Sequence, residues 1–140
     1  MKIVKFTLLM LSLFLGCKDT TVSSIEESLE LTINKSDFSL DEPIISNLSN
    51  QSSSSVFLYH CNRKSIPEIE KQEKDNWIIY YVPICPAIYI SGVTEFESGK
   101  EIENSMTIKE AGIYRLRYSY SFTYNNSLDK ILYSKEFKVE

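Results

Sequence analysis

A run of strict alternation near the C-terminus constrains the fold more than any other feature. From residue 114 to residue 124, every second position is aromatic or leucine, and the positions between are arginine, serine or threonine. The apolar series is Tyr114, Leu116, Tyr118, Tyr120, Phe122 and Tyr124. Successive side chains of a β-strand point to opposite faces, so this period predicts a strand over residues 113–124 with one buried face. A polar turn at 125–127 and a returning strand at 131–139 complete a predicted long β-hairpin.

Shorter segments with strand character occupy the rest of the chain. Leu29, Leu31 and Ile33 alternate with polar residues. Further strands are predicted over residues 43–48, 56–61, 77–82, 88–90 and 102–108. The strands at 56–61 and 77–82 are apolar on both faces, which favours the middle of a sandwich. The charged stretch 66–75 contains Pro67 and predicts one or two helical turns.

This pattern predicts an all-β fold. Seven or eight short strands with polar turns are typical of an antiparallel β-sandwich, which we expect over residues 28–140. A small up-and-down barrel is the main alternative.

Composition narrows the function classes. The chain of 140 residues suits one domain. After the first 16 residues, 13 basic and 19 acidic residues remain, and this net charge of −6 argues against a nucleic-acid partner. No Gly-x-Ser-x-Gly elbow, phosphate-binding glycine loop or calcium loop is present, and the one histidine is His60. We therefore expect a non-catalytic protein without cofactor or metal; an enzyme would need a pocket of converging polar groups around His60.

The N-terminus has the layout of a secretory signal. Lys2 and Lys5 form a basic region, residues 6–15 form an apolar region, and Gly16 is the small residue before a cleavage point. Ten helical residues span about 15 Å, half of a hydrocarbon core of about 30 Å, so a transmembrane helix is not expected. Residues 18–27 are polar and without period, which predicts a flexible tether.

Residues 14–17, Phe-Leu-Gly-Cys, resemble the lipobox of bacterial lipoproteins. In that family the signal peptide, here residues 1–16, is cut off before the cysteine. The thiol then receives a diacylglyceryl group, and the new amino terminus can take a fatty acid such as palmitate. The resemblance implies lipid attachment at Cys17 and a place in the cell envelope. Lys18 and Asp19 favour the outer membrane and leave its periplasmic or surface face open. The alternative is cleavage by a general signal peptidase, with Cys17 incidental.

Residues 110–116, Glu-Ala-Gly-Ile-Tyr-Arg-Leu, resemble the acid-x-Gly-x-Tyr-x-Cys segment of immunoglobulin (Ig) domains. This resemblance implies an Ig-like β-sandwich in which Tyr114 bonds to the backbone as a tyrosine corner. Leu116 stands at the position of the cysteine, so the antibody type of inter-sheet disulfide is not expected.

Cys61 and Cys85 form a pair once Cys17 is assigned to lipid. Each lies at or just after the end of a predicted strand, and a secreted location permits a disulfide between them. Free thiols and a metal or redox pair are the alternatives. His60 and Cys61 are adjacent in a strand and point to opposite faces, so they do not easily share one ion. We expect a structural disulfide.

Three tyrosines are candidates for a partner-binding surface: Tyr120, Tyr124 and Tyr133. If the hairpin projects beyond the sandwich, they are exposed and suited to anchor a protein or glycan; otherwise they fill the core or cover an edge. We therefore expect an envelope lipoprotein with a non-catalytic binding or accessory domain. The alternative is an inhibitor of a secreted hydrolase, such as a protease or lysozyme, with a loop stiffened by the prolines beside Cys85.

We expect Cys17→Ser to move the protein out of the membrane fraction. The substitution removes the thiol that receives the lipid, and each buried CH₂ of an acyl chain contributes about 0.8 kcal/mol to membrane binding. Ultracentrifugation of lysed cells with immunoblotting measures the partition, and Cys85→Ser is the control that keeps Cys17. Unchanged partitioning of Cys17→Ser would contradict lipid attachment.

Overall fold

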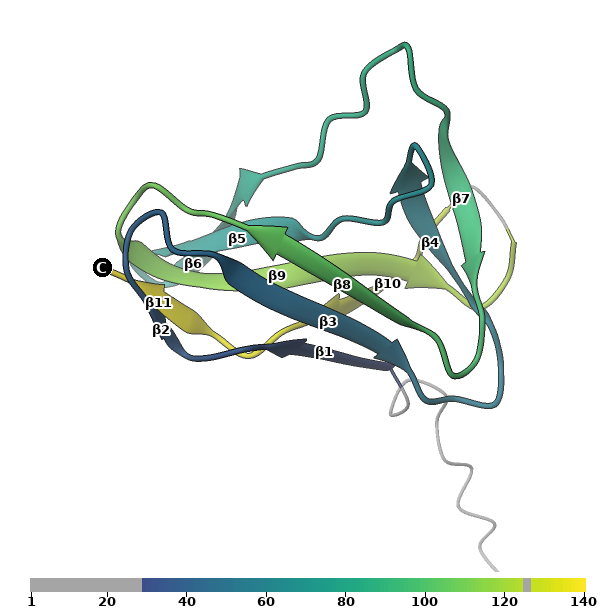
Figure 1. Cartoon of the computed structure of the whole chain (residues 1–140), viewed down its shortest axis with the longest axis horizontal. Helices are drawn as coiled ribbons and strands as arrows, with labels where there is room; N and C mark the ends of the chain where they lie inside the picture. The colour runs from purple at the N-terminus through teal and green to yellow at the C-terminus, as the bar shows by residue number, and fades with distance from the viewer. Residues whose placement is uncertain (1–28, 125–126) are drawn as a thin grey trace, which may run out of the picture.

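The computed structural model describes residues 29–124 and 127–140, and in these residues every regular element is a β-strand (Figure 1). Cys17, the signal segment and the tether lie outside the described residues. The strands are β1 (Leu29–Ile33), β2 (Asp37–Phe38), β3 (Ile44–Asn50), β4 (Val56–Cys61), β5 (Glu68–Glu73), β6 (Asn76–Tyr81), β7 (Ser91–Phe96), β8 (Glu101–Met106), β9 (Gly112–Ser121), β10 (Lys130–Tyr133) and β11 (Phe137–Val139). In this part of the chain no helix is long and apolar enough to cross a membrane.

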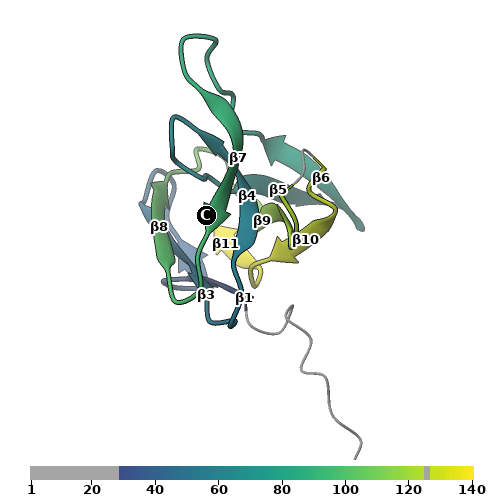
Figure 2. The same cartoon turned by 90° about the vertical axis from the view of Figure 1, so that its right-hand side faces the viewer.

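The strands form two sheets that face each other (Figure 2). The smaller sheet has the order β1-β3-β8, and the larger follows β2-β11-β9-β4-β7, with β10 and β5 also paired to β9 and β6 paired to β5. The first described strand, β1, lies in the small sheet, and the chain then crosses to the large one, where β2 runs parallel to β11. Two separate sheets with β9 between β4 and the last strands make an Ig-like sandwich. The predicted fold class is confirmed, and the barrel alternative is wrong.

The large sheet is built on β9. Its ten residues pair with β11 and β10 along one edge and with β5 and β4 along the other. The returning chain bulges at Ser134, whose hydroxyl accepts the Leu116 N–H at 2.9 Å, while the Ser134 N–H donates to the Leu116 carbonyl at 3.0 Å. The predicted hairpin is therefore present, with its return strand divided into β10 and β11.

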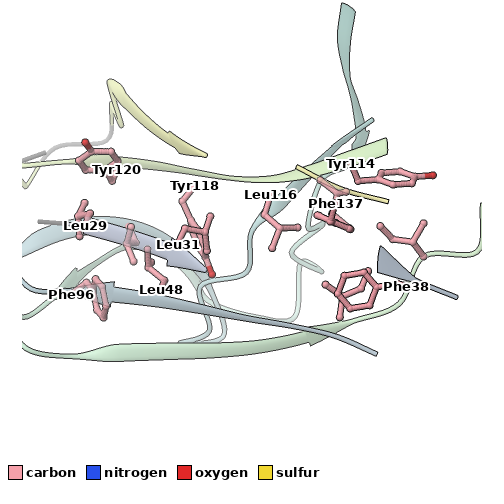
Figure 3. Close-up of a cluster of buried hydrophobic side chains, with 14 of the residues drawn as sticks. Leu29, Leu31, Phe38, Leu48, Phe96, Tyr114, Leu116, Tyr118, Tyr120 and Phe137 are labelled. Atoms are coloured by element: carbon pink, nitrogen blue, oxygen red, sulfur yellow. The ribbon is translucent and has the colours of Figure 1, made fainter. Parts of the chain in front are cut away.

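Alternate side chains of β9 form the centre of the core. Tyr114, Leu116, Tyr118 and Tyr120 are all buried, as the sequence period predicts. Side chains from both sheets and from the strand ends surround them: Leu29, Leu31, Phe38, Leu48, Phe96 and Phe137 (Figure 3).

Hydrogen bonds from two buried tyrosines fix the relation of the sheets. The Tyr114 hydroxyl donates to the Glu110 carbonyl at 2.8 Å, which is the bond of a tyrosine corner between β8 and β9. A Cβ at Gly112 would lie 2.8 Å from Lys71 Cε and 3.2 Å from the Tyr114 ring, so a glycine suits this position. The Tyr118 hydroxyl donates to the Ser65 carbonyl at 3.1 Å and accepts from Asn104 Nδ2 in β8 at 2.8 Å. Burial raises the pKa of both phenols.

Three local predictions are wrong. Residues 68–73 form β5 and not helical turns, because pairing with β9 and β6 satisfies their backbone groups and overrides a weak helical preference. The strand at 77–82 is β6, which pairs only with β5 and lies at an edge, not in the middle of the sandwich. Residues 88–90 belong to a loop. Eleven strands are present in the described residues where seven or eight are predicted, because β2 and β5 are additional and the return strand is divided into β10 and β11.

We expect Tyr118→Phe to lower the free energy of unfolding at neutral pH by about 1–3 kcal/mol, because it removes two buried hydrogen bonds. The raised pKa of Tyr118 also makes the free energy of unfolding depend on pH. Above about pH 10 the unfolded chain releases the Tyr118 proton while the folded chain keeps it, so wild-type stability falls with rising pH. This fall should be less steep in Tyr118→Phe.

Urea unfolding between about pH 8 and about pH 11 measures both effects. Tyr124→Phe, at an exposed ring, is the control and should change neither. Equal slopes in wild type and Tyr118→Phe would contradict the role of this phenol.

Candidate functional site

An apolar loop, residues 83–90, joins β6 to β7 and rises above the sandwich (Figures 1 and 2). Ile84, Ile88 and Ile90 are 85%, 84% and 79% exposed, more than any other large apolar side chain that the structure describes. Single exposed apolar residues are ordinary on protein surfaces, but a group of them marks a contact site. The loop is therefore the first part of the candidate site.

A disulfide and backbone bonds hold the loop to the end of β4. Cys61 and Cys85 are joined, with their Cα atoms 5.3 Å apart, so the disulfide prediction is supported and the structure does not leave them as free thiols. The Asn62 N–H donates to the Ile90 carbonyl at 2.9 Å at the other end of the loop. Asn62 and Arg63 have positive φ and form a tight turn, which pairs Cys61 with Lys64. The loop is thus tied down at both ends while its isoleucines stay exposed.

The edge strand β6 extends the apolar surface from the loop along the sheet. Residues 78–82 are 37–47% exposed although all are isoleucine, tyrosine or valine. No charged residue occurs between Asp75 and Glu95. We call residues 77–90 the β6–loop surface. A hollow of about 300 Å³ lies beside it and is lined by apolar and charged side chains: Tyr59, Ile66, Val82, Pro83 and Tyr118, together with Glu68, Arg117 and Ser119.

A buried ion-pair network places β6 on the sheet. Glu70 is buried on β5, and its carboxylate accepts from Arg115 Nε at 2.7 Å and from Arg117 Nη1 at 3.2 Å. The Arg115 guanidinium is stacked between two rings, 4.2 Å from the Trp77 centroid and 3.9 Å from the Tyr133 centroid. Two cations compensate the buried carboxylate, and the stacked arginine connects β9 to β6. Stacking of Arg115 on Trp77 therefore fixes the position of β6 together with its backbone pairing to β5.

The three tyrosines predicted as a surface do not form one. Tyr120 is only 4% exposed and points into the core, so its assignment to an exposed surface is wrong. Tyr124 is exposed and packs edge-on against Phe57 at 5.6 Å, while Tyr133 covers Arg115. Sequence reasoning missed the β6–loop surface, although the long uncharged stretch 76–94, with prolines on both sides of Cys85, was a visible signal.

His60 has a local structural contact. Its Nδ1 accepts the Arg63 N–H at 3.2 Å in the tight turn after β4. Within residues 29–124 and 127–140, no three His, Cys, Asp or Glu side chains gather closely enough to hold a metal ion.

Comparison with known proteins leaves the function open. No protein-family model and no curated protein match the chain. Among solved structures it is similar to the ASH / PapD-like domain of human CEP192 (PapD-like domain 7), at 11% sequence identity and a TM-score of 0.31, over 80% of this chain and 82% of that one. A similarity at this level supports no conclusion about activity or partners.

We expect Cys85→Ser to lower the free energy of unfolding by about 3 kcal/mol. The bond closes a loop across a sequence separation of 24 residues, and opening it restores conformational freedom to the unfolded chain. Urea unfolding measures the change. Cys61→Ser should give the same loss and the double variant no more, whereas additive losses would contradict a shared bond.

Proposed function

We propose that this chain is a lipid-anchored, non-catalytic protein of the bacterial cell envelope whose 83–90 loop, within the β6–loop surface, binds another protein. The observation that carries the proposal is the group of three exposed isoleucines on a loop closed by the Cys61–Cys85 bond. Binding orders flexible segments at a cost, so a loop that is already tied down loses less conformational entropy on association.

The chemistry of the surface favours a protein partner over a glycan. Isoleucine and tyrosine side chains supply apolar and amphipathic area, and the hollow beside the loop offers space for a partner side chain. Sugars need many polar side chains for their hydroxyls, and the stretch 77–90 has few.

The position of the loop fits display from a membrane anchor. β1, where the described chain begins, and the 83–90 loop lie on opposite sides of the sandwich in both views (Figures 1 and 2). A lipid on Cys17 would reach the domain through a tether of at most about 35 Å. Anchoring at that end leaves the loop facing away from the membrane.

An inhibitor of a secreted hydrolase is the second candidate function. The favouring observation is the form of the loop, which projects from the sandwich, is uncharged, contains Pro83 and Pro86 and is fixed by a disulfide. Such a loop is suited to enter an enzyme cleft without losing much freedom.

Affinity capture tests the proposal. We expect the full chain to recover a partner from envelope extract and Ile88→Asp to recover it at least tenfold less, because the substitution places a charge in the apolar contact. Tyr124→Asp, at an exposed ring outside the β6–loop surface, is the matched control and should keep the partner. Quantitative mass spectrometry measures the recovery.

Equal recovery by wild type and Ile88→Asp would contradict the assigned surface, and loss with Tyr124→Asp alone would assign binding to the hairpin end. If the recovered partner is a hydrolase, its activity with added chain decides between the two candidate functions.

A further inference from the structure

β6 differs from the other edge strands in its lack of charge. An edge strand presents unpaired N–H and C=O groups, and proteins protect such edges with charged residues, proline or very short strands. Each other edge strand in the described residues carries at least one charged residue: Glu30 in β1, Asp37 in β2, Glu95 in β7, Glu101 and Glu103 in β8, and Lys130 in β10. β6, with the sequence Asn-Trp-Ile-Ile-Tyr-Tyr, has none. This edge is therefore suited to pairing.

The charge distribution of the chain favours a second copy of the chain as the partner of the β6 edge. Residues 17–140 carry a net charge of −6, so two copies repel each other wherever carboxylates meet. The stretch 76–94 has no charged residue. A two-fold interface brings the same patch of both copies together, and a patch without charge does so without like-charge contacts.

The register of β6 defines how two copies can meet. The pairing of β5 with β6 shifts between Ile69 and Glu70, so β6 is regular only up to Ile79. In a two-fold antiparallel pair, one residue lies opposite itself. With Ile78 at that point, Trp77 lies opposite Ile79 of the second copy, and every central pair is aromatic or β-branched, which stabilises sheets.

We propose that β6 pairs antiparallel with β6 of a second copy, centred on Ile78, so that the two large sheets become one continuous sheet. The dimer presents two 83–90 loops, one from each copy. This pairing does not depend on what the loop binds, because it uses the edge of β6 and not the isoleucines of the loop.

Mass measurement with a matched substitution tests the dimer. We expect the full chain, purified in detergent, to give twice the chain mass by light scattering after the detergent contribution is subtracted. Ile78→Lys should raise the dimer dissociation constant at least tenfold, because it puts two cations opposite each other. Ile113→Lys is the control: Ile113 is 40% exposed, as against 39% for Ile78, but lies on β9, which is paired on both edges.

Ile88→Asp should also remain dimeric, which separates the β6 edge from the loop. A monomeric wild type, or a dimer that survives Ile78→Lys unchanged, would overturn the proposal. Circular dichroism of the lysine variants shows whether each keeps its sheets.

Cross-linking gives an independent measurement that does not rely on a destabilising charge. With Cys61 and Cys85 bonded to each other, Ile78→Cys should form an intermolecular disulfide on a non-reducing gel, and Ile113→Cys should not. The emission of Trp77, the one tryptophan of the chain, should change on dilution through the dissociation constant. Absence of the Ile78→Cys cross-link would overturn the pairing.

Discussion

Backbone pairing along both edges of β9 is the constraint on which the rest of the structure depends. Four strands, β4, β5, β10 and β11, pair with β9, and the side chains on its two faces make different contacts. One face carries the tyrosines and Leu116 that fill the space between the sheets. The other carries Arg115 and Arg117, which bind the buried Glu70 and so hold β5, with β6 beyond it, on the sheet. A change in β9 would therefore disturb the core and the candidate site together.

The candidate site combines apolar exposure with local restraint. An exposed apolar loop gains nothing from burial in the isolated domain, so other interactions must fix its conformation. The Cys61–Cys85 bond and the Asn62–Ile90 hydrogen bond do so from β4, while stacking of Trp77 on Arg115 fixes β6 from β9. These restraints leave the isoleucines of the loop exposed for contact with another molecule.

Sequence reasoning succeeded for properties that the residues of one strand show by themselves. It failed for properties that depend on which other strands lie beside that strand. The period of two in β9 identified the buried face, and the count of cysteines identified the disulfide pair. The apolar faces of residues 77–82 predict a strand in the middle of the sandwich, yet β6 has a partner on one side only. The sequence leaves the burial of Tyr120 open, because whether the hairpin projects depends on whether another strand, here β4, lies beside this part of β9. Both failures have the same cause, because the residues of a strand do not determine how many other strands pair with it.

The sequence by itself determined the strand-rich fold class, the core face of β9 and the pairing of Cys61 with Cys85, because side-chain period and cysteine count are local properties. Only the tertiary structure decided that β5 is a strand, that β6 is an edge and that the 83–90 loop projects with its isoleucines exposed. Apolar residues in a sequence show only that burial would be favourable; whether they are buried depends on which other strands come to lie against them.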